Sequence, residues 1–231
     1  MFAQRDDASV GSPSPGPEEA RFLETLDVAI DAIRSAGIPF VVIGGIASAA
    51  QGRPRWEPRD ADIDIFVRTE DAEPALETLS GQGFEREPGE PHWVLRASRR
   101  GVTVDVIFRA AGDLYLDDEM LGRAEQREFR GRTVPLVSRE DLLVMKALAF
   151  GEQTPSYWHE ALGIIARGEL DWDYVLYRAR HGTRRVLSLL VYAQSNDLPV
   201  PPQVVHELFE LTEGSTDKDP WTEDPRTLPT T

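Results

Sequence analysis

Asp62 and Asp64 are the residues that point most directly to chemistry, because they stand two apart in an otherwise apolar segment over residues 61–67. Residues two apart on a β-strand point to the same face, so we expect the two carboxylates side by side while Ile63 and Ile65 enter a core. Like charges this close repel, and a hard divalent cation between them relieves the repulsion. The segment therefore predicts a metal site. The alternative is a solvated pair on an edge strand.

A third carboxylate, Asp105, lies among the apolar residues of a strand expected over residues 102–108. An aspartate in such a place is disfavoured unless something pairs with it. If this strand lies beside the strand of Asp62, three carboxylates converge on one edge of a sheet. Such oxygen donors suit one or two Mg²⁺ ions, which can hold a nucleoside triphosphate and neutralise a leaving pyrophosphate.

A Gly44-Gly45 turn follows an apolar run over residues 40–43 that predicts a strand. Without side chains, this backbone can approach phosphate oxygens closely. A short helix expected over residues 46–51 would present free amide groups at its N-terminus, which favour anions. The turn is therefore a candidate phosphate-binding site beside the carboxylates.

The elements that must position these residues form two groups. Residues up to about 137 predict a mixed α/β module, and the later residues predict helices, the first opened by a capping-box spacing at Ser138-Arg139-Glu140-Asp141. We expect a leader at 1–18, a catalytic core at 19–137, a helical domain at 138–213 and a tail at 214–231, both ends being disordered. The elements expected by period and breakers are helices 19–36, 46–51, 70–79, 138–150, 156–166, 171–180, 183–194 and 202–211, and strands 40–43, 61–67, 84–87, 92–97 and 102–108.

The formal net charge of −15 and the absence of cysteine limit the class of protein. The chain has no disulfide or thiolate metal site. It shows neither a membrane-spanning run nor a secretion-signal pattern, so we expect a cytoplasmic protein without a membrane partner. The acidic balance disfavours an extended nucleic-acid surface, yet local arginine clusters allow a nucleotide to bind. The clusters are Arg53, Arg55 and Arg59; Arg127, Arg130 and Arg132; and Arg178, Arg180, Arg184 and Arg185.

Together these motifs resemble the nucleotidyltransferase fold of the polymerase β superfamily. Within it, Gly44-Gly45-Ile46-Ala47, Gly52, Arg55 and Asp62-Ile63-Asp64, followed by the lysine-bearing segment 134–149, are similar to the branch of AbiEii-type toxins and related uncharacterised transferases. The resemblance covers about residues 38–166. It implies an α+β fold class, a nucleotidyltransferase-like mixed sheet flanked by helices and followed by a C-terminal helical domain.

The resemblance also implies roles for particular residues. Asp62, Asp64 and Asp105 would be catalytic and bind metal, with Asp105 acting on the acceptor hydroxyl. The nucleotide would be bound by Gly44, Gly45, Ser48, Lys146 and Arg55. Lys146 lies on the apolar stripe of its helix, which favours a reach toward the phosphates; the alternative is a lysine at the boundary whose stem is buried.

Two departures from the family pattern stand out. Asp60 takes the place of a threonine that relatives often have two residues before the first metal aspartate, and it is either a spare ligand or the start of the strand. After the lysine helix, relatives often carry an arginine and an Asp-x-x-Asp, where this chain has Glu152-Gln153 and then Tyr157-Trp158-His159-Glu160. These later contacts bear on the acceptor, which the sequence leaves open.

The expected activity is Mg²⁺-dependent transfer of a nucleoside monophosphate from a nucleoside triphosphate to an acceptor hydroxyl. The acceptor is a tRNA end, as for a toxin with a cognate antitoxin and with the late arginines on phosphates, or a protein, or a small cationic molecule such as an aminoglycoside. A different class of function is a non-catalytic nucleotide-binding regulatory protein. The three intact aspartates argue against that alternative.

Overall fold

The computed structural model describes residues 16–51, 62–151 and 154–214, and its centre is a seven-stranded mixed sheet in the order β3-β4-β5-β2-β1-β7-β6. Strands β1 and β2 are antiparallel, whereas β2 runs parallel to β5 and β1 parallel to β7. The strands are β1 Phe40–Val42, β2 Ile63–Val67, β3 Glu85–Glu87, β4 Val94–Arg99, β5 Val102–Ile107, β6 Glu125–Phe129 and β7 Arg132–Leu136. The expected α+β class with a mixed sheet is confirmed.

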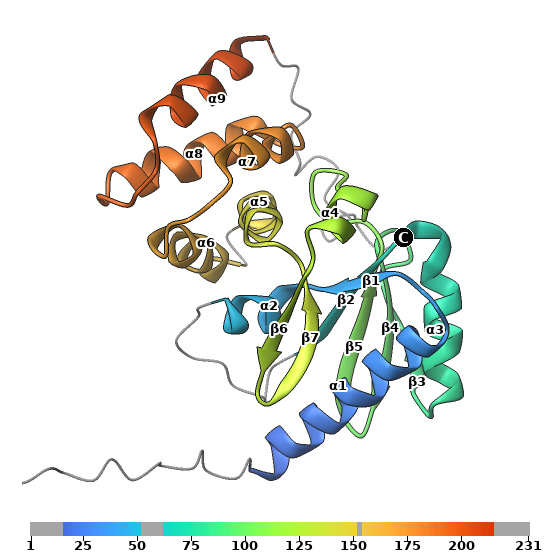
Figure 1. Cartoon of the computed structure of the whole chain (residues 1–231). Helices are drawn as coiled ribbons and strands as arrows, with labels where there is room; N and C mark the ends of the chain where they lie inside the picture. Colours follow the sequence, from blue (N-terminus) through green and yellow to red (C-terminus); the bar gives the residue numbers. More distant parts are fainter. Residues whose placement is uncertain (1–15, 52–61, 152–153, 215–231) are drawn as a thin grey trace, which may run out of the picture.

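Helices cover the sheet and extend beyond one end of it. Figure 1 shows α1 and α3 beside the sheet and α5 to α9 gathered at the opposite end of the molecule from α1. The helices are α1 Pro17–Ser35, α2 Gly44–Ala50, α3 Ala72–Gly81 after a 3-10 turn at Thr69–Asp71, α4 Asp118–Gly122, α5 Arg139–Ala149, α6 Ser156–Ala166, α7 Trp172–Ala179, α8 Thr183–Gln194 and α9 Pro202–Gly214. No helix among the described residues is long and apolar enough to cross a membrane.

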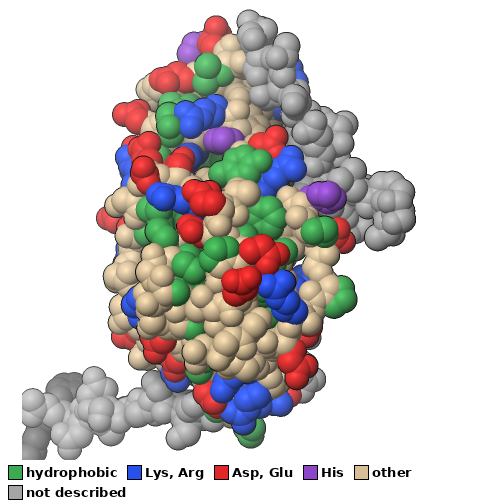
Figure 2. Space-filling model, turned by 90° about the vertical axis from the view of Figure 1, so that its right-hand side faces the viewer, with side chains coloured by type: hydrophobic (Ala, Val, Ile, Leu, Met, Phe, Trp, Pro, Cys, Tyr) green, Lys and Arg blue, Asp and Glu red, His purple; other side chains and the backbone are tan. Residues whose placement is uncertain are grey.

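Charged side chains of both signs are mixed on the surface. Figure 2 shows acidic and basic side chains interspersed on one face of the molecule, with no extended area of one sign. Many of the surface arginines are ion-paired with a nearby carboxylate, as in Arg34–Asp31, Arg86–Glu73 and Arg132–Asp27.

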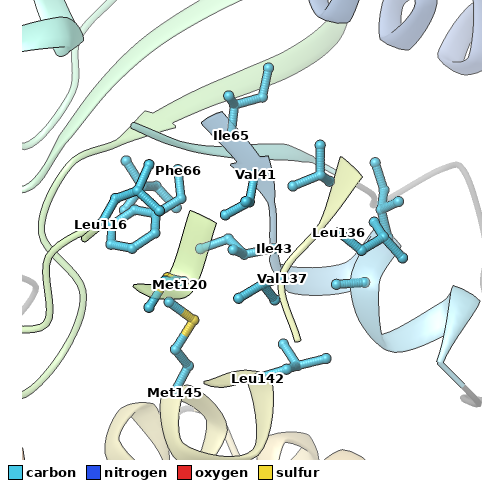
Figure 3. Packing of buried hydrophobic residues seen from close by; sticks show 14 of the residues in the cluster. Val41, Ile43, Ile65, Phe66, Leu116, Met120, Leu136, Val137, Leu142 and Met145 are labelled. Carbon is cyan, nitrogen blue, oxygen red and sulfur yellow. The ribbon is translucent and has the colours of Figure 1, made fainter. Parts of the chain in front are cut away.

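One apolar core joins the sheet to the helices that follow it. In Figure 3, Val41 and Ile43 from the β1 region pack toward Met120 of α4 and Leu142 of α5. All four side chains are at most 7% exposed and belong to the same buried cluster. The boundary expected at residues 137 and 138 falls between β7 and α5, and the division into two domains stays a prediction.

Local sequence signals account for where α1 begins and ends and for where α5 begins. Helix α1 begins at Pro17, two residues before the expected start, because proline has the right φ for a first helical position. It ends before Gly37, whose φ is 71°. The cap of α5 is as expected, since the Ser138 hydroxyl accepts a hydrogen bond from the Asp141 N–H at 3.1 Å.

The hairpin of β6 and β7 and the short helix α4 are not among the expected elements. The arginines of this region surround a turn at Arg130 and Gly131, where φ is 51° and 79°, and this turn joins two paired strands. Strand β6 is exposed except at Phe129, so it lacks the alternation of a half-buried strand. Strand β7 contains Pro135, which disfavours a strand prediction.

Several expectations fall on parts of the chain that the structure does not describe. The leader up to residue 15 and the tail from residue 215 are among them. So is the segment 52–61, which contains the predicted nucleotide ligand Arg55 and the extra carboxylate Asp60. These remain predictions from sequence.

Candidate active site

A row of charged side chains crosses four neighbouring strands of the sheet. Asp64 on β2 is paired in register with Asp105 on β5, and Asp105 is paired with Arg96 on β4. Arg96 is in turn opposite Glu87 on β3. Residues paired in register point to the same face of a sheet, so these side chains form one line, which we call the charged row. Asp62 lies immediately before β2, two residues from Asp64 on the same face.

Asp105 in this row is held by Arg96. The guanidinium donates from Nε to Oδ1 of Asp105 at 2.6 Å and from Nη2 to Oδ2 at 2.8 Å, a bidentate pair. Asp105 is 5% exposed, whereas the Arg96 side chain is about one-third exposed, at 34%. Because the guanidinium donates these hydrogen bonds to Asp105, the pKa of Arg96 is raised further above its usual range. The aspartate expected to need a partner therefore has one from the neighbouring strand.

The carboxyl of Asp64 titrates near neutral pH. Burial is the largest cause that raises its pKa to about 7, followed by the nearby charge of Asp105, with a smaller contribution from Asp62. The ammonium of Lys146 and a hydrogen bond from the Gly45 backbone N–H oppose this shift. The repulsion that the Asp-x-Asp spacing predicts thus operates in the folded chain.

Asp62 is the exposed member of the carboxylate group. Partial withdrawal of its carboxyl from solvent and the charge of Asp105 raise its pKa, while Arg96 lowers it. The mutual influence of Asp62, Asp64 and Asp105 places the three carboxyls close to one another.

The two glycines of the turn differ in their surroundings. Gly44 has φ of 62°, and a Cβ built on it would lie 1.8 Å from Oδ2 of Asp64. Gly44 is therefore required for the close approach of the turn to this carboxylate. A Cβ on Gly45 would meet nothing within 4 Å, so the space beside this residue is open.

Lys146 lies in a buried polar cluster on the other side of the turn. Its ammonium is 2.8 Å from Oε2 of Glu160 on α6, and the two side chains are 6% and 7% exposed. The Ser48 hydroxyl on α2 donates to the same Glu160 oxygen at 2.7 Å. The ammonium also lies 4.1 Å from the centre of the Tyr157 ring. Helices α2, α5 and α6 thus meet at one acid, Glu160.

Glu160 was not among the candidate site residues. It belongs to the Tyr157-Trp158-His159-Glu160 segment after the lysine helix, which the sequence presents only as a departure from the family pattern. One signal was available: Glu160 precedes the buried Ile164 by four residues, so it lies on the apolar face of α6. An acid on an apolar helix face implies a buried partner.

The structure brings together Asp62, Asp64, Asp105, Gly44, Gly45, Ser48 and Lys146. Arg55 and Asp60 lie outside the described residues. Among the late arginines expected to contact phosphates, Arg178 is wrong for that role because it is completely buried.

Arg178 instead forms an internal network. Its guanidinium donates to both carboxylate oxygens of Asp117 at 2.6 and 2.7 Å, and its Nε lies 2.8 Å from Oδ1 of Asp141. The Tyr174 hydroxyl donates to Asp141 as well. This network ties α7 to α5 and to the start of α4. Arg178 therefore stabilises the fold and does not face solvent.

The donor chemistry of the carboxylate group fits a hard divalent cation, because Asp62 and Asp64 lie two residues apart on one face of the strand and carboxylate oxygens are the ligands that such a cation prefers. The arrangement is not that of a complete three-ligand site. Within the described residues, no group of three or more His, Cys, Asp or Glu side chains has the geometry of a metal site. Arg96 is hydrogen-bonded to both oxygens of Asp105, so a cation would have to compete with this guanidinium for the third carboxylate.

One family model shows the class of protein. The family model described as "Nucleotidyl transferase of unknown function (DUF2204)" matches residues 22–182. No curated protein matches the sequence.

Three of the solved structures that match this chain come from two proteins. The solution structure of the antibiotic-resistance factor ANT(2'')-Ia has a TM-score of 0.48 and 16% identity, covering 77% of this chain and 93% of that one. Its crystal structure in complex with adenylyl-2''-tobramycin has a TM-score of 0.47 and 16% identity, covering 75% and 97%. Lincosamide antibiotic adenylyltransferase LnuA, lincomycin-bound, has a TM-score of 0.45 and 15% identity, covering 61% and 94%. At these TM-scores, the likeness says nothing about the substrate of this chain.

Proposed function

The chain belongs to the DUF2204 family of nucleotidyl transferases, and on that basis we propose that it moves a nucleoside monophosphate from a nucleoside triphosphate to a hydroxyl group with the help of a bound Mg²⁺ ion. The acceptor oxygen attacks the α-phosphorus in line, the bond to the bridging oxygen of pyrophosphate breaks, and pyrophosphate leaves with the electron pair. The hydroxyl proton passes to a base or to water.

The observation that best supports this reaction is the convergence of Asp62, Asp64 and Asp105 beside the Gly44-Gly45 turn. These carboxylates concentrate negative charge where the triphosphate would add further negative charge. They can bind the triphosphate only if a cation and nearby positive groups compensate this charge. The charge of the Lys146 ammonium lowers the pKa of Asp64, so Lys146 supplies one such positive group.

Each residue then has a role that its position allows. Asp62 and Asp64 hold the Mg²⁺ ion, which neutralises charge on the triphosphate and the leaving pyrophosphate. Gly45 leaves open space for the phosphates. Asp105, fixed by Arg96, accepts a hydrogen bond from the acceptor hydroxyl and orients it. Arg55 remains a proposed nucleotide ligand.

For the acceptor, we favour a small cationic molecule. Glu87 and Asp62, both exposed, extend the negative charge around the charged row toward the outer strands of the sheet. Figure 2 shows no extended basic area on the face it presents, and Arg178 is unavailable to a polyanion. An acidic surrounding attracts a cation and repels RNA phosphates.

A tRNA acceptor is the second candidate. It rests on the resemblance of the Gly-Gly turn and the lysine helix to AbiEii-type toxins, and with it comes a cognate antitoxin as a partner. In the late arginine cluster, Arg180 lies over the Tyr177 ring at 3.8 Å, and Arg185 donates to the Phe150 carbonyl at 2.8 Å.

A transfer assay distinguishes these acceptors. The full chain is incubated with Mg²⁺ and each α-labelled nucleoside triphosphate, together with tRNA, a protein extract or a panel of aminoglycosides. We expect label in the aminoglycoside fraction and release of pyrophosphate. Label in tRNA would favour the second candidate.

Two variants serve as controls for this assay. Asp64→Asn should abolish transfer, and Asp31→Asn, the same change on an exposed carboxylate of α1, should not. No label in any fraction, together with identical behaviour of wild type and Asp64→Asn, would contradict the proposed reaction.

A further inference from the structure

Arg96 is the one cation in the charged row, and it is fixed in place. It lies on β4 directly opposite Asp105 on β5, and both of its hydrogen bonds to that carboxylate are short, at 2.6 and 2.8 Å. Both Asp105 oxygens are engaged at once. The geometry is built by strand pairing, so it does not depend on a mobile loop.

Other carboxylates also act on Arg96. The charges of Asp62 and Glu87 stabilise its guanidinium in addition to that of Asp105. Arg96 thus lies among acidic groups. Without its guanidinium, these groups would attract a cation from solution. A guanidinium cannot lose its proton at physiological pH, so its charge is permanent.

The charge count limits what else can bind. Asp62, Asp64 and Asp105 together carry three negative charges when ionised, and one divalent cation plus the guanidinium of Arg96 balance them. A second divalent cation beside Asp105 would lie close to that guanidinium and be repelled by it. It would also have to compete with a bidentate pair for the same two oxygens.

We propose that Arg96 takes the place of a second metal ion beside Asp105, so that the centre binds a single divalent cation at Asp62 and Asp64. This inference rests on the proposed function, because it concerns the cation which that reaction uses. Arg96 is a positioning residue: it holds the Asp105 carboxylate and supplies fixed positive charge next to it. Its loss opens the Asp105 end of the row to a second cation.

Counting bound Mn²⁺ tests the proposal without measuring activity. The free-ion signal in electron paramagnetic resonance is titrated with the full chain and Mn²⁺ alone. We expect one Mn²⁺ per wild-type chain and two per chain for Arg96→Gln. Arg96→Lys, which keeps a cation, should stay at one.

The matched control is Arg86→Gln, which removes an arginine from the adjacent strand β3. Arg86 is paired with Glu73 at 2.9 Å on the surface and points to the opposite face of the sheet from its neighbour Glu87 in the charged row, so the count should remain one. A cooperative thermal unfolding transition for each variant would establish that the variant is folded. The wild-type count needs no variant and tests the proposal by itself.

The outcomes separate this inference from the reaction on which it rests. Two Mn²⁺ ions in the wild type, or one in folded Arg96→Gln, would overturn the role of Arg96 and leave the metal-dependent transfer standing. No Mn²⁺ in the wild type would overturn both.

Discussion

At the scale of single residues, the two glycines of the turn are present for different physical reasons. Gly44 combines a φ of 62° with a Cβ position that would collide with Asp64, whereas Gly45 has neither a positive φ nor any atom within 4 Å of a built Cβ. The first glycine is required by the folded chain itself. The second is required only if something else, such as a phosphate, must approach it.

Alanine at each position separates these reasons. Gly44→Ala should lower the free energy of unfolding by at least about 1–3 kcal/mol, because it strains the backbone and its Cβ collides with Asp64. Gly45→Ala should leave that free energy nearly unchanged and weaken nucleotide binding, since its Cβ occupies the open space. Denaturant unfolding and nucleotide titration measure the two effects. Full nucleotide affinity in Gly45→Ala would exclude the turn from phosphate binding.

Asp64 makes stability depend on pH. Its pKa is raised to about 7 in the folded chain from an ordinary 3.8, so the folded state holds a proton that the unfolded state has released. The contribution of this carboxyl to the free energy of unfolding is therefore fully present below about pH 4 and is lost as the pH rises through about 7.

Asp64→Asn should remove this dependence. In a chelator, we expect the variant to exceed the wild type in free energy of unfolding by roughly 1–3 kcal/mol at pH 8, with the difference shrinking toward pH 4. Urea unfolding at several pH values measures it, and Asp31→Asn on α1 controls for the chemical change. A difference that grows as the pH falls would refute the assignment.

At the scale of elements, the contact of α2, α5 and α6 depends on one buried ion pair. Lys146 of α5 and Glu160 of α6 are almost completely withdrawn from solvent, and Ser48 of α2 completes the cluster. Removing one partner of such a pair leaves an uncompensated charge in the interior, whereas replacing both by apolar groups often does not destabilise.

The pair therefore predicts a difference between single and double variants. Glu160→Ala should lower the free energy of unfolding by about 3–5 kcal/mol. Lys146→Met combined with Glu160→Leu should recover most of that loss but not nucleotidyl transfer, because the ammonium near Asp64 is gone. Thermal unfolding and pyrophosphate release give the two readouts. Normal transfer by the double variant would reduce the pair to a structural role.

At the scale of the whole molecule, the network of Arg178 joins α7 to α5 and to the start of α4. Asp117 at the start of α4 and Asp141 in the first turn of α5 both depend on this guanidinium for compensation. Burial raises the pKa of Asp141, and the nearby charge of Arg178 lowers it. The position of α5, and with it of Lys146, is set partly by this network.

Two nearby arginines allow a test of that role. Arg178→Met should lower the free energy of unfolding by about 3–5 kcal/mol, since it leaves buried carboxylate unpaired. Arg180→Gln, two residues along and exposed, should have little effect on it. Urea unfolding compares them. An Arg178→Met chain as stable as the wild type would show that the network contributes little.

Much of the fold could be predicted because its signals are local. The apolar period of α1, the cap at Ser138 and the apolar strands β1, β2 and β5 each follow from a few neighbouring residues. The β6–β7 hairpin could not, because its outer strand is held by pairing in the sheet and not by an apolar face.

The sequence by itself determined that Asp62 and Asp64 share a strand face, since that depends only on the two-residue period of a strand. It also showed Gly44 and Gly45 after an apolar strand, Asp105 within another apolar strand and Lys146 on the apolar face of a helix. Only the tertiary structure decided the partners. Strand register set Arg96 against Asp105, and helix packing set Glu160 against Lys146. Lys146 and Glu160 lie on two separate helices and Arg96 and Asp105 on two separate strands, and the apolar period of each segment does not specify which side chain of the other segment it meets.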